Sequence, residues 1–169
     1  MKATPIQLRT RADLARLVPP DGLIIELGVA AGKFAREMLD ANPLARYTGI
    51  DRWNDHHDEA EMREANQRLI EWERVCLLRS TFAEAVDKFP NEHADLIYVD
   101  GYAHTGQDGG QTLRDWWPKV KRGGIFAGHD YCAEYQPTVD AVDAFVAEHG
   151  FDLHIIDDGP HPSWWIRKF

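Results

Sequence analysis

The sequence predicts an α/β fold with a doubly wound sheet, mostly parallel with an antiparallel last strand, and helices on both faces. Five short runs of β-branched and apolar residues are each separated from the next by a helix-like segment, which is the βαβ pattern of a parallel sheet. A glycine-rich turn joins the first run to its helix. The tail, residues 151–169, holds two further strand-like runs joined by Gly-Pro-His-Pro, a link too short for a crossover helix, so the last pair should be antiparallel.

The expected elements follow from local signals along the chain. Thr10 and Asp13 have the spacing of a capping box and open a short helix over 11–17, which Pro19 and Pro20 end. The expected strands cover 22–28, 45–51, 74–80, 94–100 and 123–129. The expected helices between and after them cover 32–42, 58–73, 81–89, 110–117 and 138–150.

Composition limits the class of protein. The 169 residues are 44% hydrophobic, which predicts one globular domain over 1–169, with 1–20 as an N-terminal helical segment. A net charge of −9 with scattered positive charges argues against nucleic acid as a partner. No apolar run is long enough to span a membrane and no leader-like segment is present, so we expect a cytoplasmic protein without a membrane partner. Cys76 and Cys132 are expected to be free thiols.

The glycine-rich turn lies in IIELGVAAGKF, residues 24–34, and three ligand classes compete for it. A P-loop is excluded because the glycine spacing is one residue short and Phe34 stands where a hydroxyl is needed. A dinucleotide fingerprint is disfavoured because Glu26 occupies the first glycine position, the third glycine is absent, and a carboxylate repels a pyrophosphate. A ligand with positive charge would instead be attracted by Glu26.

A second carboxylate supports a nucleoside as this ligand. Asp51 ends the next expected strand, and a carboxylate at that place in a doubly wound fold can accept both hydrogen bonds of a ribose diol. Glu26, Gly28, Gly32 and Asp51 together therefore describe a cationic nucleoside. Tight-turn glycines and a helix-capping Asp51 are the plainer interpretation of the same residues.

These residues resemble the first motif of the class I S-adenosylmethionine-dependent methyltransferases, an acidic residue followed by x-Gly-x-x-x-Gly, at Glu26, Gly28 and Gly32. The resemblance runs from about Gly22 to the C-terminus and implies a Rossmann-like sheet with S-adenosylmethionine as the cofactor.

The resemblance also implies further cofactor contacts. The segment after the third strand, Ser80, Thr81 and Phe82, would contact the adenine. Arg52 and Trp53 follow the ribose carboxylate at the mouth of the expected crevice, where the Trp53 ring could pack on the cofactor or the acceptor.

Polar residues also follow the fourth and fifth strands. Asp100 ends the fourth strand, and His129 and Asp130 follow the fifth. Neighbouring parallel strands bring such residues together at the crevice where ligands of open α/β sheets bind, so Asp100 should also lie near the cofactor. Two carboxylates and one histidine form a set of oxygen and nitrogen ligands suited to a divalent metal.

The pattern DG…H…DWWP…GG…GHDY is similar to small bacterial relatives of the catechol and macrolide-sugar O-methyltransferases, in which acidic residues at these strand ends bind a divalent metal. The resemblance implies magnesium or manganese at Asp100, His129 and Asp130, holding an acceptor hydroxyl and lowering its pKa. Those enzymes commonly have two adjacent acids where this chain has His129 and Asp130, a set that suits manganese, iron or zinc better than magnesium.

Two other roles remain open for this group. His104 or His129 could act as a general base without any metal, because histidine titrates near neutral pH. Alternatively, His129 is structural and Asp130 caps the next segment. His56 and His57 are expected to lie in a surface loop.

The sequence therefore predicts a methyltransferase that moves a methyl group from S-adenosylmethionine to a small-molecule hydroxyl, with Asp100, His104 and His129 as the catalytic residues. An NAD-type oxidoreductase is the first alternative, which Glu26 disfavours. A non-catalytic adenosine-ligand binding module is the second, and it would have no use for the residues after the fourth and fifth strands. Little chain is left to build a lid, so the pocket should be open or closed by a second subunit in a homodimer.

Overall fold

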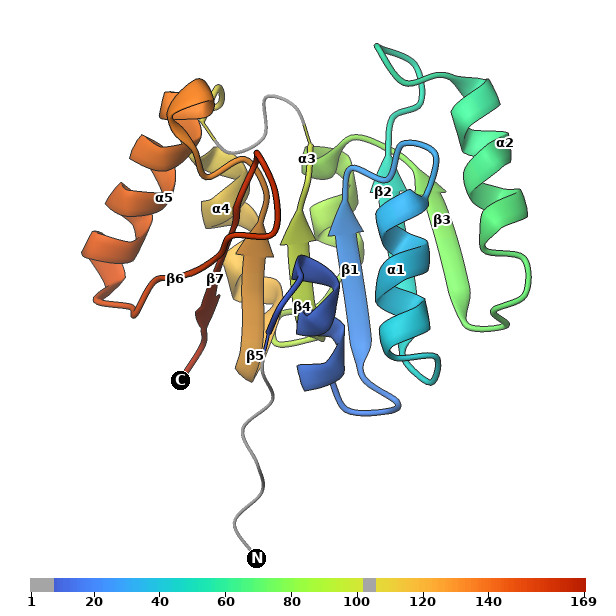
Figure 1. Ribbon diagram of the computed structural model, residues 1–169, viewed down its shortest axis with the longest axis horizontal. Coiled ribbons are helices and arrows are strands. Elements are labelled where there is room, and N and C mark those ends of the chain that lie inside the picture. The colour runs from blue at the N-terminus through green and yellow to red at the C-terminus, as the bar shows by residue number, and fades with distance from the viewer. Residues whose placement is uncertain (1–7, 102–105) are drawn as a thin grey trace, which may run out of the picture.

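The computed structural model describes residues 8–101 and 106–169, and its core is a seven-stranded sheet in the order β3-β2-β1-β4-β5-β7-β6 (Figure 1). The first five strands pair in parallel, and β7 runs antiparallel to both β5 and β6. The predicted fold class is confirmed, including the antiparallel pair at the end of the chain. The strands are β1 (Leu23–Leu27), β2 (Arg46–Asp51), β3 (Val75–Arg79), β4 (Ala94–Val99), β5 (Val120–Gly128), β6 (His154–Ile156) and β7 (Ser163–Arg167).

Helices cover both faces of this sheet, as predicted. The 3₁₀-helix η1 and α1 pack on one face, and α3, α4 and α5 pack on the other (Figure 1). Alternate residues of each strand supply the two cores: Ile25 faces the α3–α5 side and Ile24 faces the α1 side. The α-helices are α1 (Lys33–Ala41), α2 (Glu59–Arg68), α3 (Phe82–Ala85), α4 (Gln111–Trp116) and α5 (Gln136–His149), and the 3₁₀-helices are η1 (Arg11–Leu17), η2 (Val86–Lys88), η3 (Trp117–Lys119) and η4 (Ala133–Tyr135).

Some boundaries differ from the predictions for local reasons. The capping box of Thr10 and Asp13 is present, but the segment it opens is a 3₁₀-helix. The second helix ends at Arg68, before the predicted residue 73, because Leu69 and Trp72 reach the core through a turn in which the Trp72 amide donates to the Leu69 carbonyl. The last helix begins with a proline in its first turn, where a missing amide costs nothing.

The strand order changes direction between β1 and β4. These two strands are parallel neighbours, so their carboxyl ends lie side by side. Open α/β sheets bind ligands at such a switch point, outside the carboxyl ends of the strands. Gly28, Asp51, Thr81 and Asp100 follow or end the strands β1 to β4 there. Cys76 and Cys132 are free thiols, and none of the helices described is long and apolar enough to cross a bilayer.

Candidate cofactor and acceptor site

The turn after β1 needs glycine at its first position. Gly28 has φ +99°, and a Cβ built there would lie 2.3 Å from the Asp100 carbonyl oxygen. Its amide donates to the Ile50 carbonyl at 2.8 Å, so the turn is held against both neighbouring strands. Gly32, with φ +72°, precedes α1, and a Cβ there would lie 3.1 Å from the Cα of Ala65. Gly28 therefore allows the backbone ends of β1 and β4 to touch, and Gly32 allows α2 to approach α1.

Asp51 fixes the shape of this turn. The amides of Val29 and Ala30 donate to its Oδ2 at 2.8 and 2.9 Å, and the Trp53 amide donates to its Oδ1 at 3.0 Å. The Asp51 residue is 5% exposed and still lines the pocket at the edge of the sheet. Since a carboxylate oxygen has two lone pairs, Oδ1 keeps the capacity to accept one more hydrogen bond.

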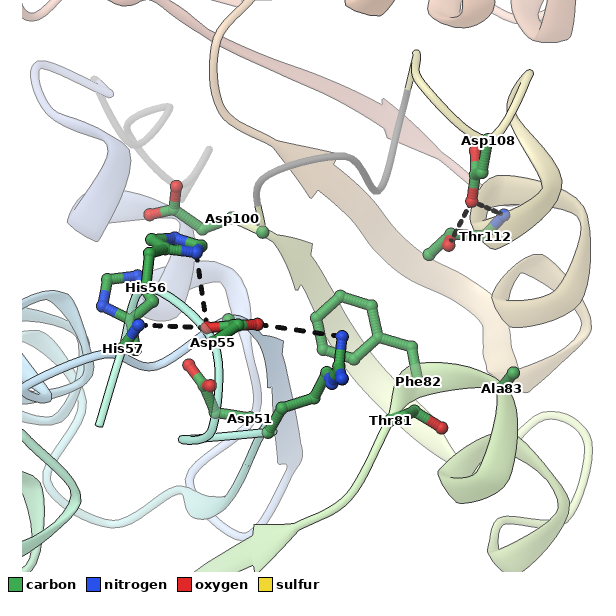
Figure 2. Close-up of a pocket in the computed structure, with 13 residues that line it drawn as sticks. Asp51, Asp55, His56, His57, Thr81, Phe82, Ala83, Asp100, Asp108 and Thr112 are labelled. Atoms are coloured by element: carbon green, nitrogen blue, oxygen red, sulfur yellow. Dashed lines mark hydrogen bonds and ion pairs between the residues drawn. The ribbon is translucent and has the colours of Figure 1, made fainter. Parts of the chain in front are cut away.

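A pocket of about 340 Å³ lies beside Asp51 and opens at the carboxyl ends of β1 to β4, within the size range of small-molecule sites. Figure 2 shows Asp55, His56 and His57 on one side of it, Asp108 and Thr112 on the opposite side, and the Phe82 ring between them. The lining residues are Gly28, Asp51, Arg52, Asp55, His56, His57, Thr81, Phe82, Ala83, Asp100, Gly101, Asp108 and Thr112. We call this the adenosine pocket from its predicted ligand.

The predicted cofactor residues divide into those that line this pocket and those that support it. Arg52, Thr81 and Phe82 line it, whereas the Ser80 amide donates to the Asp51 carbonyl behind it. The expectation that the Trp53 ring packs on the ligand is wrong, because Trp53 is 1% exposed. Its indole packs in an apolar cluster and donates from Nε1 to the Ala30 carbonyl at 2.9 Å. Trp53 therefore supports the glycine-rich turn from the protein interior.

Glu26 is buried at 1% exposure and accepts a hydrogen bond from the Tyr47 hydroxyl. Burial raises the pKa of Glu26 from 4.5 to about 8, although the Tyr47 hydrogen bond acts in the opposite direction. The carboxyl is therefore mostly neutral at pH 7, and its attraction for a cation is weaker than the sequence indicates. Glu26 nevertheless borders a second pocket, so a positive charge bound there would favour its ionised form.

This second pocket, about 310 Å³, continues from the adenosine pocket past Gly28, His57 and Asp100, which line both. We call it the tail pocket. Its other lining residues are Arg11, Glu26, Val29, Ala30, Ala31, Lys33, Phe34 and Glu61. The Arg11 side chain, on which no prediction was made, reaches it from η1 and forms an ion pair with Asp100 at 3.1 Å.

The structure brings together the predicted group at the ends of β4 and β5. Ligand atoms of Asp100, His129 and Asp130 all lie within 4.8 Å of one another. Nδ1 of His129 lies 3.3 Å from Oδ1 of Asp100 and 3.0 Å from Oδ1 of Asp130. Burial lowers the pKa of His129, but its hydrogen bonds to both carboxylates outweigh this and raise the pKa to about 9. His104, the other predicted base, lies outside the described residues.

His161 extends this group toward solvent, and its position was not predicted. It lies in the turn between β6 and β7, with Nε2 at 3.2 Å from Glu134 and its ring centroid 6.0 Å from that of His129. A third pocket of about 560 Å³ opens between this turn and η1, lined in part by Arg11, His129 and His161. Arg11 and His161 come from opposite ends of the chain, so only the fold reveals that both line a pocket with His129.

Comparison with known proteins identifies the family. A sequence profile described as "Methyltransferase domain" matches residues 25–131, which extend from β1 past the end of β5. The chain belongs to the methyltransferase domain family.

Solved structures agree with this assignment at the level of the fold, that of the class I S-adenosylmethionine-dependent methyltransferases. A Staphylococcus aureus protein assigned as a caffeoyl-CoA O-methyltransferase matches with TM-score 0.71 and 16% identity over 96% of this chain and 85% of that one. A Streptococcus mutans protein assigned as a methyltransferase, solved in complex with SAH, matches with TM-score 0.70 and 16% identity over 93% of this chain and 94% of that one.

A curated sequence relative is much longer than this chain. The uncharacterized protein y4gI of Sinorhizobium fredii is 32% identical over 88 residues, which is 52% of this chain and 8% of that protein. The matched segment therefore spans less than a tenth of that relative.

The residues of this methyltransferase domain fit its family's cofactor. Gly28 and Asp100 line both pockets, so a ligand that occupies both would lie along the backbone of the glycine-rich turn. The adenosine pocket offers an aromatic ring and a free acceptor position on Asp51, and the tail pocket offers charges of both signs. The donor set of Asp100, His129 and Asp130 also suits a divalent cation, although Arg11 and His129 already compensate the two carboxylates.

Proposed function

We propose that this protein transfers the methyl group of S-adenosylmethionine to a hydroxyl oxygen of a small-molecule acceptor. The observation that carries the proposal is the junction at Asp100, where the adenosine and tail pockets meet beside a carboxylate–histidine group. A binding module would need the pockets alone. A group transfer also needs residues that bind or accept the acceptor proton next to the cofactor. Asp100, His129 and Asp130 would supply these residues, because Asp100 lines both pockets.

In the adenosine pocket, Oδ1 of Asp51 would accept a ribose hydroxyl while the same carboxylate holds the turn. The Phe82 ring and Thr81 would border the adenine, and the 55–57 segment would cover it from the other side (Figure 2). When bound, the sulfonium would supply an electrophilic methyl group.

The acceptor would enter from the third pocket, on the side of His129. With a pKa of about 9, His129 is mostly protonated at pH 7, so it donates to the carboxylates and to an acceptor oxygen and orients them. As the acceptor oxygen takes the methyl group, its proton would pass to a carboxylate oxygen of Asp130, which lies beside His129. Holding both reactants at fixed positions supplies much of the rate enhancement in such a transfer.

The first expected result concerns the cofactor. In calorimetric titrations of the unmodified protein, S-adenosylhomocysteine should bind and NAD should bind at least about 10-fold more weakly. The glycine-rich turn lacks the third glycine of the dinucleotide fingerprint, and the Asp100 carboxylate beside the turn opposes a pyrophosphate. Tighter binding of NAD would favour the oxidoreductase alternative. Binding of S-adenosylhomocysteine without methyl transfer to any of a broad panel of hydroxylated acceptors would favour the binding module.

A second expected result separates metal assistance from a metal-free mechanism. If Asp100, His129 and Asp130 hold Mg²⁺ or Mn²⁺, the ion must replace the proton on His129, so millimolar metal should raise the melting temperature more at pH 9 than at pH 6. Asp130→Asn should remove this effect, and Asp115→Asn, at a half-buried carboxylate on α4 outside this group, is the matched control. No metal effect at either pH, together with turnover unaffected by a chelator, would leave the histidine–carboxylate mechanism alone.

A further inference from the structure

The tail pocket contains an ion pair between Arg11 and Asp100. Arg11 lies on η1, and its Nη1 contacts Oδ2 of Asp100 at 3.1 Å; the two side chains are 23% and 22% exposed. Both residues line the tail pocket. The pair is thus neither buried in the core nor free in solvent, and both of its charges face the cavity that continues from the adenosine pocket.

The position of Arg11 is fixed by several contacts. Its guanidinium lies over the Phe34 ring, with 4.2 Å between the guanidinium carbon and the ring centroid. Its backbone amide donates to Oδ2 of Asp158 at 2.6 Å. The capping box of η1 holds the preceding residue, since the Thr10 amide donates to Asp13 at 2.9 Å. A flexible side chain anchored in this way loses little entropy when it binds a ligand.

We propose that the Arg11–Asp100 pair binds the α-amino-acid end of the cofactor, with the Arg11 guanidinium on the carboxylate and Asp100 on the ammonium group. An α-amino acid carries one negative and one positive group on a single carbon. Placed against an ion pair, it completes an alternating arrangement of four charges, in which each group meets two opposite charges. Charge-assisted contacts of this kind are stronger than neutral hydrogen bonds, and a guanidinium can hold a carboxylate with two of them.

The alternative cation in the same pocket is less suited to this role. Lys33 begins α1 and is exposed to solvent, with a flexible stem. Arg11, in contrast, is held in the pocket by its ion pair with Asp100 and by its contact with the Phe34 ring. Lys33 therefore provides a matched control: it has the same charge and lines the same pocket, but it is not paired with Asp100.

This inference rests on the proposed function, and three ligands separate the two. S-adenosylhomocysteine has the whole amino-acid end, its decarboxylated analogue keeps only the ammonium group, and 5′-methylthioadenosine lacks both. Affinities of these ligands are measured by calorimetry for the unmodified protein, Arg11→Gln, Arg11→Lys and Lys33→Gln. The melting temperature of each variant checks that it is folded.

Arg11→Gln should weaken S-adenosylhomocysteine roughly 10- to 100-fold, because a charged hydrogen-bonded contact is lost. It should leave 5′-methylthioadenosine within about 3-fold of its original affinity, since this ligand carries neither charged group. It should not weaken the decarboxylated analogue, because loss of the Arg11 charge leaves Asp100 free to attract the ammonium group. Arg11→Lys should give an intermediate loss for S-adenosylhomocysteine only, and Lys33→Gln should change all three by less than about 3-fold.

Equal weakening of all three ligands by Arg11→Gln, or no weakening of S-adenosylhomocysteine, would overturn the assignment of Arg11. If Arg11→Gln does not fold, the affinities of Arg11→Lys for the three ligands are compared with those of the unmodified protein. A loss confined to S-adenosylhomocysteine supports the assignment, and an equal loss for all three overturns it. If none of the three ligands binds the unmodified protein, the proposed function itself fails. Binding of all three with equal affinity to the unmodified protein refutes only the tail-pocket assignment.

Discussion

Gly28→Ala should abolish measurable binding of S-adenosylhomocysteine and lower the free energy of unfolding by about 3 to 5 kcal/mol. A methyl group there would lie 2.3 Å from the Asp100 carbonyl oxygen and 2.9 Å from the Cα of Gly101, and both are backbone atoms. The clash cannot be relieved by turning a side chain, so the ends of β1 and β4 must separate. This separation would disrupt the adenosine pocket and the tail pocket, because Gly28 and Asp100 line both of them.

The matched control for this substitution is Gly123→Ala. Gly123 also has a positive φ, +79°, but a Cβ there would meet nothing within 4 Å. It should cost only the strain of the left-handed conformation, about 1 to 2 kcal/mol, and leave ligand affinity unchanged. Chemical denaturation and calorimetry measure the two quantities. Similar losses of stability in both variants would mean that backbone strain, and not the contact between β1 and β4, makes Gly28 necessary.

Stability should fall as the pH rises from 5 to 9, with Glu26 as a main cause. Burial raises the pKa of Glu26 in the folded chain to about 8, against 4.5 for the unfolded chain. The folded state therefore holds a proton that the unfolded state has lost. The stabilisation from this proton is fully present below pH 4.5 and is lost as the pH rises through about 8, by an amount on the order of 3 to 5 kcal/mol.

Glu26→Gln isolates this contribution, because a neutral amide can still accept the hydrogen bond from the Tyr47 hydroxyl. Urea unfolding at pH 5, 7 and 9 should give a clearly smaller decline for the variant than for the unmodified protein. A part of the decline should remain, since the raised pKa of His129, about 9, acts in the same direction above pH 6.5. Parallel pH profiles for the two proteins would contradict the assignment of Glu26.

The sequence predicted the architecture because its signals are local and repeated. Each strand of the parallel sheet is a short apolar run bounded by turn residues, and the short link at Gly159 and Pro160 excludes a parallel final pair. The order of polar residues at the strand ends also placed Asp100 beside His129, because neighbouring parallel strands end at the same edge. These inferences depend only on chain neighbours and on sheet geometry.

The side-chain environments could not be predicted in the same way. The direction of the Trp53 ring depends on its positive φ, 45°, which turns the side chain into the core beneath the glycine-rich turn. The neutral state of Glu26 depends on the burial that the completed sheet imposes. Arg11 and His161 reach the site through contacts between distant segments, and no spacing in the sequence reports such contacts.

The hydrogen bond from the Arg11 amide to Asp158 joins residues that are 147 positions apart. A contact with so large a separation closes a long loop at an entropic cost, and it is not one of the pairings that define the sheet. Asp158 lies in the exposed turn between β6 and β7, and Arg11 lies on a short 3₁₀-helix, so this contact can open while the sheet stays intact. If Arg11 holds the cofactor as we propose, opening of this contact would lower the affinity for the cofactor while the global folding equilibrium stays unchanged.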